Sequence, residues 1–157
     1  MRPQDIAILL KIISLEKNEE VNNKWRNIDL ATSLKISPAE ISTSLNRSKI
    51  AKLIDSSKRQ VAKNSLKEFL VYGLKYVFPV ELGAIVKGIP TAHSASPINN
   101  SIVSNGEKLV WAYFKGTVKG QTIKPLYKSL PKVVENDLLF YELMAITDYS
   151  TGHELNF

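Results

Sequence analysis

The chain has 157 residues and a formal net charge of +6, and 44% of its residues are hydrophobic. This length and composition predict one globular domain, or one small domain plus an extension, and exclude multi-domain and fibrous proteins. The sequence contains no cysteine, which excludes disulfides, thiolate zinc sites, iron–sulfur clusters and cysteine nucleophiles. We therefore expect a reducing compartment and a cytoplasmic location.

The first apolar run, residues 6–15, predicts an amphipathic helix. Its apolar residues recur at i, i+3, i+4 and i+7 after Pro3, and the helix should end near Lys17. Lys11 interrupts the run and no small-residue cleavage site follows, so we expect no signal peptide. No stretch reaches the roughly 18 uninterrupted apolar residues that span a bilayer, so we expect no membrane association.

The excess positive charge lies in the first half of the chain. Residues 1–78 hold 14 Lys and Arg against 8 Asp and Glu, whereas residues 79–157 hold 7 against 7. Within residues 35–63 the balance is 7 basic against 2 acidic side chains. This density suits a polyanionic partner such as nucleic acid, although a solvated surface would account for the charge alone.

Two short helices joined by a tight corner are predicted between residues 27 and 50. Asn27 can cap a helix that runs to Leu34. In the next motif, Ser37 can act as N-cap, Pro38 suits the first helical position, and Glu40 can reach back to the cap amide. A second helix should therefore begin at Pro38, directly after the corner.

The stretch Ile28–Ile54 resembles the winged helix-turn-helix of MarR-like bacterial transcription regulators. The family pattern is a helix, a three-residue turn, a Ser-Pro-capped recognition helix and a closing apolar pair, which here is Leu53-Ile54. Ser48 stands where the family usually has an inward leucine, and Lys52 where it commonly has a glycine. The resemblance implies a homodimeric regulator that binds double-stranded DNA and that can also sense a small molecule at its dimer interface.

The segment after this pair, residues 55–62, contains no glycine and is too short for two full strands before the next helix. We expect a reduced wing or only a basic loop.

A recognition helix over residues 38–49 would turn one polar face toward the major groove. Stepping by 100° per residue from the inward Ile41 and Leu45 places Asn46 and Arg47 outward, with Ile50 on the same face. Asn pairs with adenine and Arg with guanine, while flanking lysines neutralise phosphates. The alternative is a solvent-exposed face on a protein-binding helix-turn-helix. The predicted DNA-binding residues are Ser37, Ala39, Ser42, Thr43, Asn46, Arg47, Lys49, Lys52, Lys58, Arg59 and Lys63.

A helix over residues 64–77 follows, with apolar positions at a period of 3.6. Gly73 on its apolar stripe indicates that another element packs closely against it. Both sides of this helix are apolar, which favours a helix-rich core or a dimer interface. Tyr72, Tyr76, Trp111 and Tyr113 would line a ligand pocket, or else belong to the core.

The second half of the chain shows weaker patterns. Residues 79–108 lack periodicity over a length that suggests a functional or partner-bound segment. Residues 109–114 are rich in strand formers, and a turn at Lys115-Gly116 predicts a small β-hairpin with residues 117–123. A last helix starts near Pro131, and its apolar residues cover most of the circumference, which indicates dimerisation or burial within one chain.

No motif for catalysis is present. His93 and His153 have no acidic residues at metal-ligand spacing, and Ser94 lies outside any nucleophile motif. No glycine-rich phosphate loop precedes a helix. We expect no enzymatic activity, no cofactor and no metal.

These patterns predict a mainly α, α+β protein with a winged-helix-like helix-turn-helix over residues 1–78. Residues 79–157 would form a helical C-terminal extension containing the long loop and the small β-hairpin, and would serve dimerisation or partner contact. The predicted function is a homodimeric, sequence-specific transcription regulator. The alternative is an antitoxin-like or adaptor protein that binds a protein partner through residues 79–108.

Overall fold

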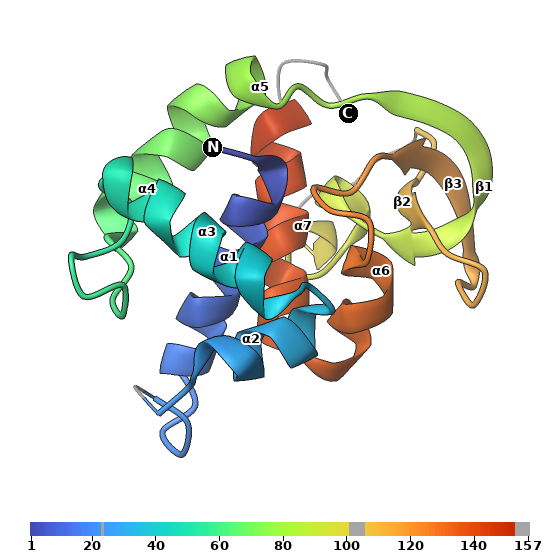
Figure 1. Ribbon diagram of the computed structural model, residues 1–157. Helices are drawn as coiled ribbons and strands as arrows, with labels where there is room; N and C mark the ends of the chain where they lie inside the picture. The colour runs from blue at the N-terminus through green and yellow to red at the C-terminus, as the bar shows by residue number, and fades with distance from the viewer. Residues whose placement is uncertain (23, 101–105, 153–157) are drawn as a thin grey trace. The chain divides into compact units, whose positions relative to one another are not determined.

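The computed structural model describes residues 1–22, 24–100 and 106–152 (Figure 1). The chain combines α-helices with a small three-stranded sheet, which confirms the expected mixed α and β class. It divides into two compact units. The helical unit comprises residues 1–68 and 126–140, and the strand unit comprises residues 69–125 and 141–157. The chain therefore passes from the helical to the strand unit at residue 68, ahead of the predicted boundary at residue 78, and later returns.

Three helices begin the helical unit: α1 (Pro3–Glu16), α2 (Asn27–Leu34) and α3 (Pro38–Ile50). The predicted ends of α1 and α2 and the start of α3 are confirmed within a residue. α2 and α3 each bury one face, as the helical period predicts, whereas α1 is buried all around from Asp5 to Ile12 and is not the amphipathic helix expected. The buried apolar residues of this unit include Ile6, Leu9, Leu10, Leu30, Leu34, Ile41 and Leu45.

The corner between α2 and α3 is made by local backbone chemistry. Lys35 adopts a left-handed conformation with φ 55°, and its amide donates to the Ala31 carbonyl, which ends α2. The Ser37 hydroxyl accepts a hydrogen bond from the Glu40 amide at 3.2 Å, as its N-cap role predicts. The Glu40 carboxylate does not return to the cap, because it accepts from the Gln4 side chain at 2.7 Å.

The start of α2 also differs from the expectation, since Asn27 is its first helical residue. The N-cap is Arg26, whose amide donates to the Asp29 carboxylate at 2.7 Å. An acidic side chain in the first turn therefore closes the helix end that an asparagine cap was expected to close.

A short ribbon, residues 53–62, follows α3. Ile54 pairs with Val61 in an antiparallel bridge, and the Ala62 amide donates to the Leu53 carbonyl at 2.9 Å. Lys52, directly before the ribbon, has φ 62°, so a lysine takes the left-handed conformation that glycine adopts most readily. The ribbon stands where the sequence predicts a reduced wing or a basic loop.

The helical stretch over residues 63–77 is not one regular α-helix. It consists of α4 (Lys63–Glu68), a π-helical turn (Phe69–Gly73) and α5 (Leu74–Val77). A Cβ on Gly73 would lie 2.9 Å from the Phe69 ring of the same stretch. The expectation that another element packs on Gly73 is wrong, because the neighbour is this aromatic ring.

The last helices are α6 (Leu130–Val133) and α7 (Leu138–Gly152), separated by a 3₁₀ turn. The predicted start near Pro131 thus corresponds to α6, and the long helix begins later. The Asp137 carboxylate accepts the Phe140 amide at 3.0 Å, which closes the first turn of α7. Burial within the chain accounts for much of the apolar circumference, since Phe140 and Met144 are fully buried while Leu138 and Ile146 are exposed.

The strand unit contains β1 (Leu82–Pro90), β2 (Leu109–Ala112) and β3 (Val118–Ile123), which close into a three-stranded barrel. β1 pairs antiparallel with both other strands, and β2 pairs parallel with β3. The predicted hairpin between β2 and β3 is therefore wrong. The two strands are joined by a turn and lie parallel, and β3 pairs most extensively with the longer β1.

Glycine permits this closure. A Cβ on Gly88 would lie 2.0 Å from the Trp111 carbonyl oxygen, and one on Gly120 would lie 2.5 Å from the Lys108 carbonyl oxygen. The expectation of a segment without regular structure over residues 79–108 is also wrong for its described part, which contains β1 and two 3₁₀ turns. Residues 101–105 of that segment, and His153, lie outside the described residues.

A buried aspartate joins α7 to the strands within this unit. The Asp148 carboxylate accepts hydrogen bonds from the Thr91 hydroxyl at 2.6 Å and the Trp111 indole at 2.8 Å. Tyr141, two turns earlier on the same face of α7, donates to the Pro90 carbonyl and contacts the Trp111 ring edge-on. These polar contacts give α7 a defined position against the apolar side chains of the strand unit.

Candidate nucleic-acid interface

The outer face of α3 is polar and exposed along its whole length. Ser42, Thr43 and Asn46 are exposed, as are Ser37 and Ala39 at the helix start. The opposite face carries Ile41, Ser44, Leu45 and Ser48, all of them buried. This separation arises from the helical period, since residues three and four apart share a face. The predicted outward positions 39, 42, 43 and 46 are therefore confirmed as a surface.

An exposed isoleucine continues this face. Ile50, the last residue of α3, is 81% exposed, although isoleucine is usually among the most buried residues. The Thr43 hydroxyl donates within the helix to the Ala39 carbonyl at 3.0 Å, but its oxygen can still accept a hydrogen bond. The face thus offers an amide, two hydroxyls and one apolar end.

Arg47 lies in a different place from the one predicted. Its guanidinium forms two hydrogen bonds with the buried Asp5 carboxylate of α1, Nε to Oδ2 at 2.9 Å and Nη2 to Oδ1 at 2.7 Å. The Arg47 side chain is only 21% exposed. Its expected outward position is corrected, because the guanidinium is held by a partner from α1 that sequence spacing on α3 does not show.

Asp5 is the acceptor at the centre of this contact. Besides Arg47, the Ser44 hydroxyl donates to it at 2.6 Å and the Arg2 amide at 2.8 Å. Burial alone would raise the pKa of Asp5, but the hydrogen bonds from Arg47 and Ser44 outweigh burial and hold the pKa below its ordinary value. The carboxylate therefore stays ionised and ties α1 to α3.

Two predicted phosphate contacts, Lys49 and Lys52, line a groove beside α3, and a third, Lys58, lies in the turn of the ribbon next to it. Lys49 and Lys52 are exposed and Lys58 is half-buried, and none of the three forms an ion pair with a described residue. The groove has a volume of about 390 Å³. Its lining residues are Lys49, Lys52, Ile54, Asp55, Ser56, Gln60, Val61 and Ala62.

The turn of the 53–62 ribbon is held by Asp55. Its carboxylate accepts from the Ser57 hydroxyl and from the amides of Arg59, at 2.8 Å, and Gln60, at 3.0 Å. Hydrogen bonds from Gln60 and Ser57 lower the pKa of Asp55, so it remains ionised within this basic turn. Lys58, with φ 60°, lies at the tip.

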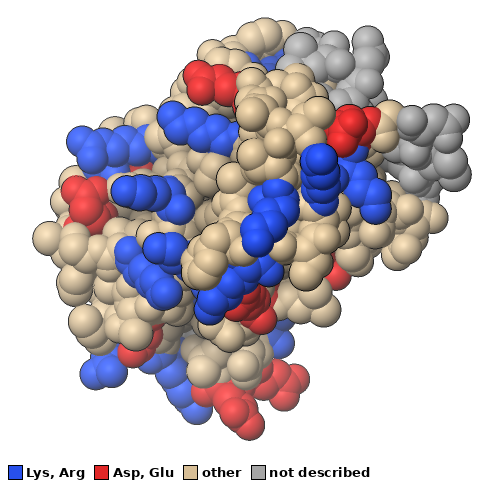
Figure 2. Space-filling model, turned by 90° about the vertical axis from the view of Figure 1, so that its right-hand side faces the viewer, with Lys and Arg blue, Asp and Glu red and all other residues tan. Residues whose placement is uncertain are grey.

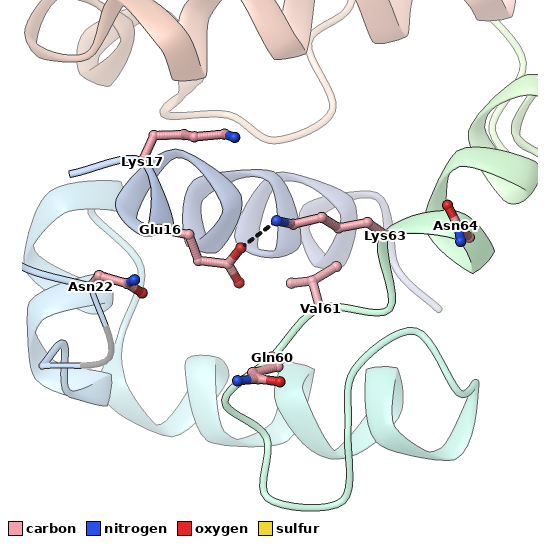
Figure 3. Close-up of a pocket in the computed structure, with 7 residues that line it drawn as sticks. All are labelled: Glu16, Lys17, Asn22, Gln60, Val61, Lys63 and Asn64. Atoms are coloured by element: carbon pink, nitrogen blue, oxygen red, sulfur yellow. Dashed lines mark ion pairs between the residues drawn. The ribbon is translucent and has the colours of Figure 1, made fainter. Parts of the chain in front are cut away.

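The other two predicted phosphate contacts have partners within the chain. The Arg59 guanidinium carbon lies 3.7 Å from the centroid of the Trp25 ring. The Lys63 ammonium pairs with Glu16 of α1 at 2.8 Å, as the dashed line in Figure 3 marks. Arg59 and Lys63 therefore anchor the ribbon and α4.

Figure 3 shows a second cleft, polar in character, around the Lys63–Glu16 pair. Its volume is about 570 Å³, and α1, the loop after α1, the ribbon and α4 contribute to it. The lining side chains are mostly charged or amide groups, so an apolar ligand would gain little there. They are Glu16, Lys17, Asn22, Gln60, Val61, Lys63 and Asn64.

The aromatic residues that were predicted to line a ligand pocket or to belong to the core do not form a pocket in the fold. Tyr72 and Tyr76 are exposed, whereas Trp111 is fully buried. Burial lowers the pKa of His93, which lies in a 3₁₀ turn of the strand unit. In the described ranges, no three His, Asp or Glu side chains gather to hold a metal ion. No described helix is both long and apolar enough to span a bilayer.

In comparisons with known proteins, no family model, no curated protein and no solved structure matches this chain.

Proposed function

We propose that this chain is a winged-helix-like, sequence-specific DNA-binding protein that acts in the cytoplasm as a homodimeric transcription regulator. The observation that supports it is the face of α3, where Ser42, Thr43 and Asn46 are exposed beside Lys49 and Lys52, which have no ion-pair partners among the described residues. A helix of this length fits the major groove, where hydroxyl and amide side chains reach base edges.

Asn46 is the residue we assign to base recognition. Its amide can donate to and accept from adenine at the same time, a pairing that distinguishes adenine from the other bases. Ser42 and Thr43, one turn earlier, can bond a base edge or a phosphate. Ile50 can contact a thymine methyl group, which explains why an isoleucine is 81% exposed at this position.

Lys49, Lys52 and Lys58 would bind the phosphate backbone. Lys49 and Lys52 line the groove at the end of α3, and Lys58 lies in the turn of the ribbon, so a phosphate backbone that passes along the groove would meet the two lysines at the end of α3. Such contacts position the protein without reading sequence, and each one makes affinity more dependent on salt. Arg47 supports the interface by holding α3 on α1 through Asp5.

The test is selection of bound duplexes from a random pool by the full-length protein at about 150 mM salt, where phosphate contacts alone bind weakly. We expect enrichment of an inverted repeat whose half-sites lie about one helical turn apart. Failure of a folded protein to enrich any sequence would contradict the proposal.

The selected duplex then tests the assigned face by fluorescence anisotropy. We expect Asn46→Ala to weaken binding about tenfold or more, since a bidentate base contact contributes on the order of 1–3 kcal/mol. The matched control is Asn99→Ala, because Asn99 is an exposed asparagine of the strand unit. Equal affinity of the Asn46→Ala protein and the wild type would contradict the assigned recognition face.

A second candidate function rests on β1. Leu82, Ile85 and Val86 are all at least 37% exposed on this strand, more apolar surface than a solvated strand requires. An antitoxin-like or adaptor protein would cover these side chains with a protein partner. Co-purification from the native host of a stoichiometric partner that Ile85→Lys abolishes, from a protein that enriches no duplex, would favour this function.

A further inference from the structure

One stretch of the strand unit, residues 69–125, is rich in positive charge, with six lysines against two glutamates. Three acidic side chains in residues 141–157 of the same unit balance most of this excess. Figure 2 looks onto the side of the molecule where β1 and β3 lie in Figure 1, and it shows lysine and arginine side chains on this face together with some acidic ones.

Two of these lysines face each other across the sheet. The register of β1 and β3 pairs Lys87 directly with Lys119, and both side chains are exposed. Residues opposed in this way point to the same face with Cβ atoms about 5 Å apart, and like charges there destabilise the pairing. Neither lysine forms an ion pair with a described residue, so no carboxylate among the described residues offsets this repulsion.

An exposed aromatic ring lies on the turn that contacts the same point of β1. The Tyr113 amide donates to the Lys87 carbonyl at 3.3 Å, and a Cβ on Gly116 would lie 2.4 Å from the Gly88 backbone. This turn therefore presents Phe114, which is 69% exposed. The Lys115 ammonium lies 5.6 Å from the centroid of the Phe114 ring.

We propose that this surface, formed by Lys87, Phe114, Lys115 and Lys119, binds single-stranded nucleic acid. The two opposed lysines would hold backbone phosphates, and a base would stack on Phe114. Binding of phosphates would explain why two lysines stand opposite each other without a carboxylate between them. Stacking of an unpaired base would explain the exposed Phe114 ring, because the base faces in a duplex are already stacked on one another. An acidic protein segment would satisfy the lysines but not the aromatic ring.

The experiment measures binding of the full-length protein to a fluorescent oligothymidylate of about 12 nucleotides, a length within the range that small barrels cover. We expect Lys87→Ala/Lys119→Ala to weaken binding at least tenfold, and to reduce the slope of log affinity against log salt by about 1.4, since two phosphate contacts are lost. The matched control, Lys17→Ala/Lys24→Ala, removes two exposed lysines of the helical unit and should leave both quantities unchanged.

Phe114→Ala separates base stacking from charge. It should weaken oligothymidylate binding about tenfold while leaving the salt slope unchanged, because it removes no cation. Three results would overturn the proposal: no binding by the folded wild type, an equal loss in the control lysine pair, or full competition by polyglutamate together with no effect of Phe114→Ala.

This proposal is independent of duplex recognition by α3, and the variants distinguish single-strand binding from duplex binding. Asn46→Ala should leave oligothymidylate binding unchanged, and Lys87→Ala/Lys119→Ala should leave the base preference of the selected duplex unchanged. Oligothymidylate binding without any duplex enrichment would refute the proposed regulator alone, and the reverse result would refute this surface alone.

Discussion

Each of the two units buries an aspartate, and the pKa values of these two aspartates are shifted in opposite directions. In the helical unit, Asp5 is held by the Arg47 guanidinium and the Ser44 hydroxyl, and its pKa lies below the ordinary value. In the strand unit, Asp148 is held by the Thr91 hydroxyl and the Trp111 indole, and burial raises its pKa to about 7 because these neutral donors only partly oppose it.

The comparison shows that the charge of the hydrogen-bond donor determines whether a buried carboxylate stays ionised in the folded state. A cation with matching geometry keeps Asp5 ionised, so the pair joins two helices as one charged contact. Neutral hydrogen bonds position Asp148 but do not balance its charge, so its ionisation in the folded state is costly. The two units are therefore expected to respond differently to mutation and to pH.

Breaking the charged contact should have the largest effect. Arg47→Ala leaves the Asp5 carboxylate buried without its cation, and we expect the free energy of unfolding to fall by about 3 kcal/mol. Urea denaturation followed by circular dichroism measures it. Arg26→Ala, which removes an exposed arginine paired with Asp29, is the control and should change little. A loss no larger than the control's would show that Asp5 does not depend on Arg47.

The double variant Asp5→Leu/Arg47→Met sharpens the same test. It removes both charges and leaves no unpaired carboxylate, so it should recover part of the stability lost in Arg47→Ala. Equal instability of the single and double variants would indicate that packing of the arginine side chain, and not charge, is what the single variant loses.

The second prediction concerns pH and Asp148. Its folded pKa, about 7, lies above the ordinary value of 3.8, so the folded state binds more protons than the unfolded state between these values. The contribution of Asp148 to stability is thus fully present below about pH 4 and is lost as pH rises to about 7, by up to about 1.4 kcal/mol per pH unit.

Asp148→Asn isolates this contribution, because the amide cannot ionise. As pH rises from about 5 to about 8, the free energy of unfolding of the variant should increase relative to that of the wild type. Burial lowers the pKa of His93, so His93 makes the free energy of unfolding rise with pH. Both proteins contain His93, so its effect cancels in the difference between them. A difference that does not vary with pH would refute the raised pKa of Asp148.

The smallest expected effect concerns a buried hydroxyl that lacks a partner. Ser48 on the inner face of α3 is fully buried, and its Oγ makes no hydrogen bond with a described residue, in contrast to Ser44 one turn earlier. Ser48→Ala should raise the free energy of unfolding by about 1 kcal/mol, whereas Ser44→Ala should lower it, because only the latter removes a donor to a buried carboxylate. Thermal unfolding distinguishes the two signs, and a loss of stability in both variants would contradict the contrast.

The elements predicted well from sequence are those whose signals are local. The apolar period of α1, the capping serine of α3 and the glycine-free connection after Ile54 depend on residues within a few positions of one another. The strand unit was predicted poorly because its pairing is not local. β1 lies about thirty residues from β3, and a hairpin between β2 and β3 is the nearer alternative that the turn at Lys115-Gly116 suggests.

The candidate site shows the same division. Helical spacing was sufficient to place Ser42, Thr43 and Asn46 on the outer face of α3. It was not sufficient for Arg47, whose partner Asp5 lies 42 residues away in the chain. An aspartate within the first turn of an otherwise buried helix was the signal that could have indicated a buried cation partner.

The sequence alone therefore determined the ends of α1 and α2 and the start of α3, the polar face of α3 and the overall excess of basic residues. Only the tertiary structure decided which cations are held by carboxylates, how three strands close around Gly88 and Gly120, and that Lys87 stands opposite Lys119. The physical reason is the distance along the chain over which each kind of interaction acts. Helix periodicity and capping act over three or four residues, whereas ion pairing and strand register depend on groups that only folding brings within a few ångströms.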